Sequence, residues 1–311
     1  MFTSRRGRTA AGVFAAGAVL TLAACSSGDP LAGDDSTGGE SDTISIGAAG
    51  FAESEIIAQI YAQALEANDI TVDFKGQIGQ RDVYIEGLED GSIDLIPEYS
   101  GNLLQFFDDS SDARTSDEVF AALQEVVPDN LEVLNQAEAE DKDSYNVTQE
   151  FSETNGVTSL ADLAGIDVPL VLGGNPELAE RPYGPTGLTE VYGVDAARIT
   201  FVPISDSGGP LTSQALVDGT VNIADIYSTT PSIEEFGFVT LEDPENLILP
   251  QNVLPLINAE KASDEVVEVL DAVSAELTTE DLIELNAMNQ GDEKLSPEAL
   301  ARDWLEEKDL F

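Results

Sequence analysis

Residues 88–100 read LEDGSIDLIPEYS, and residues 216–228 read LVDGTVNIADIYS. The two stretches are 128 positions apart, and their Leu, Asp, Gly, Tyr and Ser residues are identical. Each pattern predicts the end of a helix, a glycine that stops it, a buried strand, and Tyr-Ser where that strand ends. The repeat therefore predicts two similar units, which place Tyr99 and Tyr227 at the carboxyl ends of their strands.

Short apolar runs alternate with helical patterns on both sides of this repeat. Thr43–Ala48 predicts a strand, and Glu53–Ala67 carries apolar residues at helical spacing. The second half shows the same alternation, and the last 48 or so residues read as three helices with Ser263 and Ser296 as N-caps. Strands that alternate with helices indicate an α/β fold with mainly parallel sheets.

We expect two lobes, one built from 43–146 plus 250–311 and the other from 147–249. In open α/β sheets, ligands bind beyond the carboxyl ends of the strands. Two lobes of this kind would bring Tyr99 and Tyr227 to face one another across a ligand cleft. The alternative is that the repeat records only an ancestral duplication and that both tyrosines are buried.

The first residues predict export and a lipid anchor. Residues 1–24 combine early arginines with an apolar core that is short for a membrane span, which is typical of a signal peptide. The segment that ends at Cys25, LAAC, resembles the lipobox of bacterial lipoproteins, in which the cysteine receives a diacylglycerol. Residues 26–42 are rich in Ser, Gly and Asp and predict a flexible tether. A plain signal peptide with an incidental cysteine is the alternative, and Sec or twin-arginine export both remain open.

Composition excludes several kinds of function. The chain has 60 acidic and 13 basic residues, and nucleic-acid binding relies on clustered lysine and arginine. The chain has no histidine and one cysteine, which is Cys25. These counts remove the commonest general base, the usual zinc ligands and a free nucleophilic thiol. We therefore expect no enzyme, no metal and no cofactor, and we interpret the net acidity as a means of solubility.

Four short segments follow one another along the chain: AAGFAE at 48–53, EYSGN at 98–102, RPYGPTGL at 181–188 and YSTTP at 227–231. In this order and spacing they resemble the glycine betaine/choline-binding proteins of osmoprotectant ABC importers. The corresponding family segments read Ser-Lys-x-Phe-Thr-Glu, Glu-Tyr-Thr-Gly-Thr, Arg-x-Asp-Gly-x-x-Gly-Leu and Tyr-Ser-Thr-Asp-Gly. The resemblance covers about residue 43 to the C-terminus and implies a two-lobed, periplasmic-binding-protein-like fold with its ligand cleft between the lobes.

The resemblance also implies a ligand site. Family members hold a quaternary ammonium group in a box of aromatic rings by cation–π attraction. Tyr99 and Tyr227 match two of these rings, and Tyr145 stands where a third often lies. Arg181 matches the residue that pairs with the ligand carboxylate, for which a guanidinium is well shaped.

This sequence departs from the family pattern at several of these positions. The early lysine is replaced by Ala49, and a threonine near the first ring is replaced by Asn102. A tyrosine of some members falls on Asn252, and Tyr183 replaces an aspartate, which makes it a candidate for a fourth ring. These changes leave the class of protein intact and leave the ligand open.

The resemblance predicts a receptor that is anchored to the outer face of the cytoplasmic membrane, binds an osmoprotectant such as glycine betaine, and delivers it to the ABC permease. A receptor of the same fold for choline, carnitine, ergothioneine or an amino acid is the first alternative. An enzyme on a two-lobed scaffold is the second, and the missing histidine and free cysteine count against it.

Overall fold

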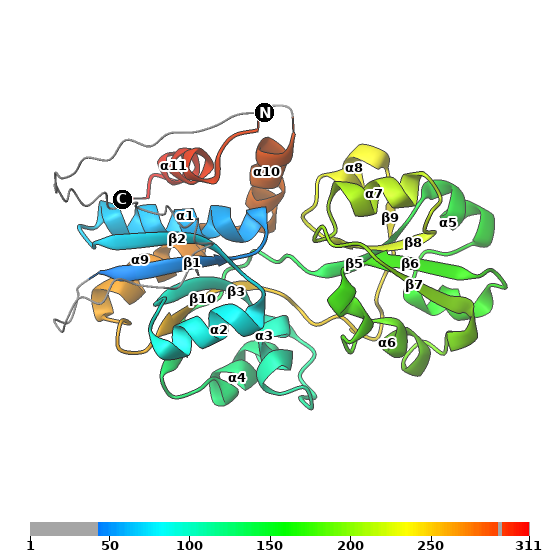
Figure 1. The fold of residues 1–311 in the computed structure, drawn as a ribbon, viewed down its shortest axis with the longest axis horizontal. Coiled ribbons are helices and arrows are strands. Elements are labelled where there is room, and N and C mark those ends of the chain that lie inside the picture. The colour runs from blue at the N-terminus through cyan, green and yellow to red at the C-terminus, as the bar shows by residue number, and fades with distance from the viewer. Residues whose placement is uncertain (1–42, 292–293, 311) are drawn as a thin grey trace, which may run out of the picture. The chain divides into compact units, whose positions relative to one another are not determined.

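The computed structural model describes residues 43–291 and 294–310 of the chain. The predicted leader (1–24), Cys25 and the tether lie outside these residues. The described residues form two sheets of five strands each, and helices pack on both of them (Figure 1).

The first sheet has the strand order β2-β1-β3-β10-β4. Its strands are β1 (Ile44–Ala49), β2 (Val72–Gly79), β3 (Leu95–Tyr99), β4 (Leu131–Val133) and β10 (Val253–Asn258). The helices that accompany it are α1 (Ala52–Ala67), α2 (Arg81–Asp90), α3 (Ser100–Phe107), α4 (Ser116–Val126), α9 (Asp264–Glu276), α10 (Thr279–Gln290) and α11 (Pro297–Glu307). Helix α1 packs against β1, β2 and β3 and is itself covered by α9, α10 and α11. Its fully buried Ile56, Ile57 and Ile60 belong to the main apolar core of this half.

The second sheet repeats this plan with the order β7-β6-β8-β5-β9. Its strands are β5 (Asp143–Val147), β6 (Leu170–Gly174), β7 (Ile199–Pro203), β8 (Ile223–Tyr227) and β9 (Val239–Thr240). Its helices are α5 (Gln149–Asn155), α6 (Pro185–Glu190), α7 (Pro210–Val217) and α8 (Ser232–Phe236), with short 3₁₀ turns at η1 (Leu160–Gly165), η2 (Pro176–Ala179) and η3 (Ala196–Arg198). The lobe boundary that the sequence suggested, between 146 and 147, falls inside β5.

The sequence repeat occupies equivalent places in the two sheets, as predicted. Helix α2 ends at Gly91 and helix α7 is followed by Gly219, and both glycines adopt left-handed backbone angles, with φ of 78° and 69°. The strands that follow are β3 and β8, and Tyr99 and Tyr227 are their last residues. A local pattern of helix end, glycine and buried strand therefore determines where both tyrosines lie.

The prediction of mainly parallel sheets is correct only for the first three strands of each sheet. Strands β2, β1 and β3 are parallel, as are β7, β6 and β8, and helical segments connect them. Strand β10 runs antiparallel to β3 and β4, and β5 runs antiparallel to β8 and β9. Both β5 and β10 directly follow a crossing from the other sheet, so no helix returns the chain to the parallel direction.

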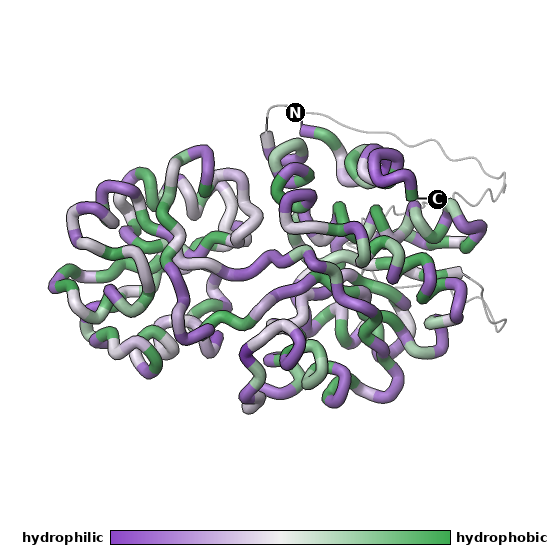
Figure 2. Tube along the Cα trace, turned by 180° about the vertical axis from the view of Figure 1, so that it is seen from behind, coloured by the Kyte–Doolittle hydropathy of each residue, from purple (hydrophilic) through white to green (hydrophobic). Residues whose placement is uncertain are grey.

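The chain crosses between the sheets twice, at 134–142 and at 241–252, and the two crossings lie side by side (Figure 2). They pair as an antiparallel ribbon, because Glu140 and Asn252 form a β-bridge. The Asp141 amide donates to the carbonyl of Gln251 at 3.2 Å, and the Val253 amide donates to the carbonyl of Ala139 at 2.9 Å. The polar backbone of both connections is therefore satisfied where they meet.

The C-terminal helices begin at the predicted caps. The Ser263 hydroxyl accepts a hydrogen bond from the amide of Val266, and the Ser296 hydroxyl accepts one from the amide of Ala299. Pro297 occupies the first turn of α11, where its missing N–H costs nothing. These caps fix the starts of α9 and α11, both of which pack against α1.

A tight contact holds α3 against the second crossing. A Cβ at Gly101 would lie 2.5 Å from the carbonyl oxygen of Pro250 and 2.8 Å from the Cβ of Leu249. We expect Gly101→Ala to lower the free energy of unfolding by about 1–3 kcal/mol, because neither neighbour is a flexible side chain that can move aside. Urea unfolding measures the change. Gly165→Ala is the matched control, since a Cβ there meets nothing within 4 Å; equal stability of the two variants would contradict the contact.

Candidate ligand-binding site

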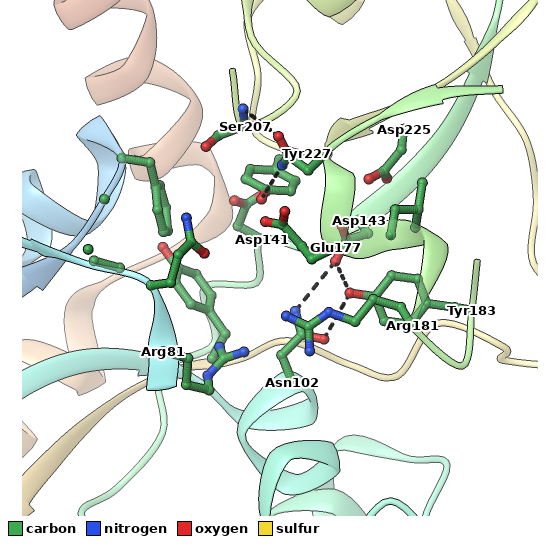
Figure 3. A pocket seen from close by; sticks show the side chains of 18 of the residues that line it. Arg81, Asn102, Asp141, Asp143, Glu177, Arg181, Tyr183, Ser207, Asp225 and Tyr227 are labelled. Carbon is green, nitrogen blue, oxygen red and sulfur yellow. Dashed lines mark hydrogen bonds between the residues drawn. The ribbon is translucent and has the colours of Figure 1, made fainter. Parts of the chain in front are cut away.

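One pocket is lined by side chains that come from both sheets and from the crossing between them (Figure 3). The first sheet and its helices contribute Ala49, Gly50, Phe51, Gly79, Gln80, Arg81, Tyr84, Tyr99 and Asn102. The crossing and the second sheet contribute Asp141, Asp143, Asn175, Glu177, Leu178, Arg181, Tyr183, Ser207, Asp225 and Tyr227. The pocket thus lies where the carboxyl ends of the parallel strands meet, which is where ligands bind in α/β sheets.

Phe51, Tyr99 and Tyr227, which we call the aromatic trio, meet in this pocket. Phe51 lies directly before α1, and its ring centroid is 5.9 Å from that of Tyr99 and 6.0 Å from that of Tyr227. Its ring is tilted by 34° to the first and stands edge-on at 66° to the second. One ring from the start of a helix therefore joins the two strand-end tyrosines of the repeat.

Arg81 enters the pocket from the start of α2 and is held by Glu98. Its Nε and Nη2 atoms donate to the two carboxylate oxygens of Glu98 at 2.7 and 2.9 Å, and Tyr84 donates to the same carboxylate at 2.7 Å. Burial alone disfavours the charged guanidinium, but the carboxylate of Glu98 outweighs it and raises the pKa of Arg81. Nη1 makes no hydrogen bond within the described residues. The pair therefore fixes a guanidinium whose remaining donor is available.

Arg181, Tyr183 and Asn102 occupy another wall of the pocket (Figure 3). The hydroxyl of Tyr183 donates to Oδ2 of Asp143 at 2.8 Å, and the Asn102 amide approaches the same oxygen at 3.4 Å. Arg181 is half-buried and forms no ion pair or hydrogen bond through its side chain within the described part of the chain. Its five donors are therefore uncommitted.

Four carboxylates surround this space, namely those of Asp141, Asp143, Glu177 and Asp225. Burial, reinforced by the neighbouring Asp143, raises the pKa of Asp225 well above the usual aspartate value. Burial and the same four carboxylates also raise the pKa of Tyr227. The carboxylates of Asp143 and Glu177 make this part of the pocket suited to a positive group, apart from the region of the two arginines.

A cluster around Glu53 lies behind the aromatic trio. The buried carboxylate of Glu53 accepts hydrogen bonds from the hydroxyls of Tyr99 and Thr229, both at 2.6 Å. It also accepts one from the amide of Asn286 on α10 at 2.6 Å. Asp141, which accepts the Thr229 amide at 3.0 Å, has a raised pKa because it is buried and lies close to the Glu53 carboxylate. The cluster thereby joins α1, β3, α10 and the segment after β8.

The structure brings five of the seven ligand-site residues suggested by the sequence into the pocket: Tyr99, Asn102, Arg181, Tyr183 and Tyr227. Two do not line it. Tyr145 is buried behind Tyr183, and its hydroxyl donates to the backbone oxygen of Tyr183 at 2.6 Å. Asn252 lies inside the first half, where its side chain accepts from Ser116 at 2.6 Å and donates to the carbonyl of Ala137 at 3.0 Å.

Sequence reasoning missed several pocket residues. Phe51 stands inside the motif AAGFAE, but a single aromatic residue before a helix gives no sign of its own that it contacts a ligand. Arg81 depends on Glu98 for its position, and that contact exists only in the fold. Asp225 could have been found from the repeat, because it lies two residues before Tyr227 and therefore on the same face of the strand. Asp143 lies outside the repeat, and its place opposite Tyr227 is set by the pairing of β5 with β8.

The described residues contain no group of histidine, cysteine and acidic side chains that could hold a metal ion. None of the helices within 43–291 and 294–310 has the length and apolar character that a membrane crossing needs. Two α/β halves joined by paired crossings, with a pocket that both of them line, define a two-lobed, periplasmic-binding-protein-like fold. The protein is therefore, by its architecture, a solute-binding protein.

Comparison with known proteins gives the family. Residues 42–307 match the profile of the substrate-binding domain of ABC-type glycine betaine transport systems. This chain belongs to that family of non-enzymatic transporter components. It is similar to the glycine betaine-binding protein YehZ of Escherichia coli (strain K12), with 26% identity over 304 residues that cover 94% of this chain and 96% of YehZ.

Solved structures agree on the fold. The ligand-free structure of YehZ from Escherichia coli superposes with a TM-score of 0.65 at 25% identity, over 86% of this chain and 99% of that one. A glycine betaine/carnitine/choline ABC transporter protein superposes with a TM-score of 0.71 at 20% identity, over 86% and 99% of the two chains. The expected fold class and family are both confirmed.

The raised pKa of Asp225 gives a prediction for stability. A buried aspartate that keeps its proton in the folded state adds stability below its usual pKa of 3.8, and that contribution is lost as the pH rises through the folded-state value. Asp225→Asn mimics the protonated form at every pH. We therefore expect the variant to be more stable than the wild type near neutral pH, with an advantage that shrinks towards pH 4.

Urea unfolding of the ligand-free protein between pH 4 and pH 8 measures this difference. Asp167→Asn changes an exposed aspartate outside the pocket and serves as the control. A constant difference between Asp225→Asn and wild type across the pH range would show that Asp225 is ionised in the folded protein.

Proposed function

We propose that this protein is the receptor of an ABC importer that binds a quaternary-ammonium osmoprotectant such as glycine betaine and delivers it to the permease. The ligand is proposed to lie in the pocket between the two sheets, with its ammonium group on the aromatic trio and its carboxylate at Arg181. The observation that carries the proposal is the meeting of three rings and an unpaired guanidinium in one pocket.

The aromatic trio suits a methylated ammonium group, because such a group has no hydrogen to donate and can be held only by ring faces and carboxylate charge. Each desolvated cation–π contact contributes about 0.5–2 kcal/mol. Tyr99 and Tyr227 are anchored by their hydroxyls, which bond to Glu53 and Asn175 at 2.6 and 3.1 Å. Rings that are fixed in advance lose little entropy when the ligand arrives.

The arginines suit the other end of a zwitterion. Arg181 has no partner within the described residues, and a desolvated carboxylate is the natural partner of a planar, bidentate donor. The free Nη1 of Arg81 supplies a second donor that, in our proposal, takes over from the lysine missing at Ala49. Asn102 and Tyr183, which are bonded to Asp143, complete the polar wall.

A receptor for choline, carnitine, ergothioneine or an amino acid is the second candidate. The carboxylates of Asp143 and Glu177 favour it, because they attract a cation whether or not it carries a carboxylate of its own. A ligand without a carboxylate would not need Arg181, which gives a way to separate the two.

The remaining parts of the proposal concern assembly. We propose that residues 1–24 direct export, that Cys25 carries the lipid anchor on the outer face of the cytoplasmic membrane, and that 26–42 tether the receptor near its permease. We also propose that the two sheets correspond to lobes that close over the ligand, hinged at the paired crossings. The family's role as the substrate-binding part of an ABC system supports the permease as partner.

Substitutions can separate the contribution of the aromatic rings to ligand binding from that of the Arg181 guanidinium. Removing a ring with Phe51→Leu or Tyr227→Leu should weaken glycine betaine binding by about 2- to 30-fold each, as one cation–π contact is lost. Arg181→Gln should weaken glycine betaine more than choline, because only the former has a carboxylate to leave unpaired. Calorimetric titration with both compounds gives the affinities.

Phe236→Leu is the matched control, since Phe236 is 43% exposed and does not line the pocket. Unchanged binding in Phe51→Leu and Tyr227→Leu would mean that the ammonium group lies elsewhere. Equal weakening of both compounds by Arg181→Gln would make Arg181 a structural residue.

The anchor is tested in the full-length chain. Cys25→Ala should abolish incorporation of a labelled fatty acid and release the protein from membranes, because the thiol is the atom that would carry the lipid. Metabolic labelling followed by fractionation measures both effects, and circular dichroism of the released protein checks the fold. Equal labelling of the variant and the wild type would exclude Cys25 as the site.

A further inference from the structure

The buried carboxylate of Asp225 has an oxygen with no hydrogen-bond partner. Nine buried side-chain atoms within the described residues lack a partner, and Oδ1 of Asp225 is the only one that belongs to a residue lining the ligand pocket. The residue is 2% exposed, so bulk water does not satisfy this oxygen. An unmet buried acceptor costs about 1–3 kcal/mol, which requires an explanation.

The sheet brings Asp225 to the pocket together with Asp143. In the antiparallel pairing of β5 and β8, Asp143 stands opposite Tyr227, and Tyr145 stands opposite Asp225. Residues two apart share a face, so both aspartates and the ring of Tyr227 lie on one side of the sheet. Figure 3 shows Asp143, Asp225 and Tyr227 around the same space.

The protein supplies hydrogen-bond donors to the carboxylate of Asp143, whereas Oδ1 of Asp225 has none within the described residues. Oδ2 of Asp143 receives the hydroxyl of Tyr183 at 2.8 Å and the amide of Asn102 at 3.4 Å. Asp225 receives no donor from any residue that the structure describes, although it is tightly placed: a Cβ at Gly174 would lie 3.1 Å from the Cβ of Asp225. A fixed acceptor without a protein donor, in the wall of a ligand pocket, is a place for a donor on the ligand.

We propose that Asp225, supported by Asp143, forms a subsite for a hydroxyl or N–H group carried by the ligand near its quaternary ammonium. The preferred ligand would then be a donor-bearing quaternary-ammonium compound, not glycine betaine, which has no O–H or N–H group. This inference rests on the proposed function, because it assumes that the ammonium group lies on the neighbouring aromatic trio.

Electrostatics agree with this placement. Burial, together with the carboxylates of Asp143 and Glu177, raises the pKa of Asp225. In its neutral form Asp225 can donate to Asp143 and leave Oδ1 as the free acceptor. A ligand carboxylate would be repelled here and is directed to Arg181. The pocket would thus recognise three groups of one ligand, namely its quaternary ammonium, its carboxylate and its O–H or N–H donor.

Matched ligands test the subsite. Carnitine and γ-butyrobetaine differ only in one hydroxyl, and choline and its O-methyl ether differ in whether the oxygen carries a hydrogen. We expect the wild-type protein to prefer the hydroxyl compound in each pair by about tenfold, the effect of one buried hydrogen bond. Isothermal titration at fixed pH and salt gives the two affinity ratios.

Variants of Asp225 then test whether this residue causes the preference for the hydroxyl compounds. Asp225→Leu keeps the branched shape and removes the acceptor, so both ratios should fall to about one. Asp225→Asn keeps a carbonyl oxygen as acceptor and an N–H group that can donate to Asp143, so it should keep the wild-type ratios. Asp225→Ala also removes the acceptor and serves if the leucine variant does not fold. Asp167→Asn should keep the wild-type ratios.

The outcomes separate this inference from the proposed function. Ratios near one in the wild-type protein overturn the subsite while both compounds still bind, and so leave the quaternary-ammonium receptor standing. Ratios that persist in the leucine and alanine variants also overturn the subsite, because the ligand hydroxyl would then be bound elsewhere. If no quaternary-ammonium compound binds, the proposed function fails instead.

Discussion

The buried carboxylate of Glu53 is the interaction on which the geometry of the pocket depends. It accepts donors from Tyr99, Thr229 and Asn286, which belong to three separate parts of the chain. A buried carboxylate is stable only when its oxygens are well satisfied, so each of these donors is held in place by the need to pair it. Phe51 lies two residues before this anchor, and Tyr99 is bonded to it directly. The positions of two of the three rings thus depend on one buried side chain.

Sequence alone predicted those features that depend on short-range patterns. Tyr99 and Tyr227 were found because a glycine that ends a helix and a buried strand after it are local features, and this motif occurs twice in the sequence. Tyr145 lies on the same face of β5 as Asp143, but Asp143 occupies the position nearer the pocket, and the family resemblance gives no sign of that difference in depth. Asn252 was a candidate because it stands where some family members have a tyrosine. In the fold its side chain donates a hydrogen bond to the carbonyl of Ala137 and does not reach the pocket.

Features that depend on distant partners were not predictable. Arg81 gains its position from Glu98, and the mixed direction of the sheets arises from the crossings, whose pairing joins residues more than 100 positions apart. From the sequence, the acidic composition was interpreted as a means of solubility, because net charge alone does not show where acidic residues gather in the fold. The structure adds that four of these carboxylates line one pocket, where they act at short range and in partly desolvated surroundings.

The paired crossings carry a constraint on the evolution of the chain. Glu140 faces Asn252 in a β-bridge, and the Asp141 amide bonds to Gln251, so the register of one connection is set by the other. In an extended ribbon, a shift of one residue turns every side chain to the opposite side. A single insertion beside this bridge would shift the pairing of the two connections and change the partner of Asp141, which lines the pocket. A matching change in the other connection, or a β-bulge that takes up the extra residue, would restore the pairing.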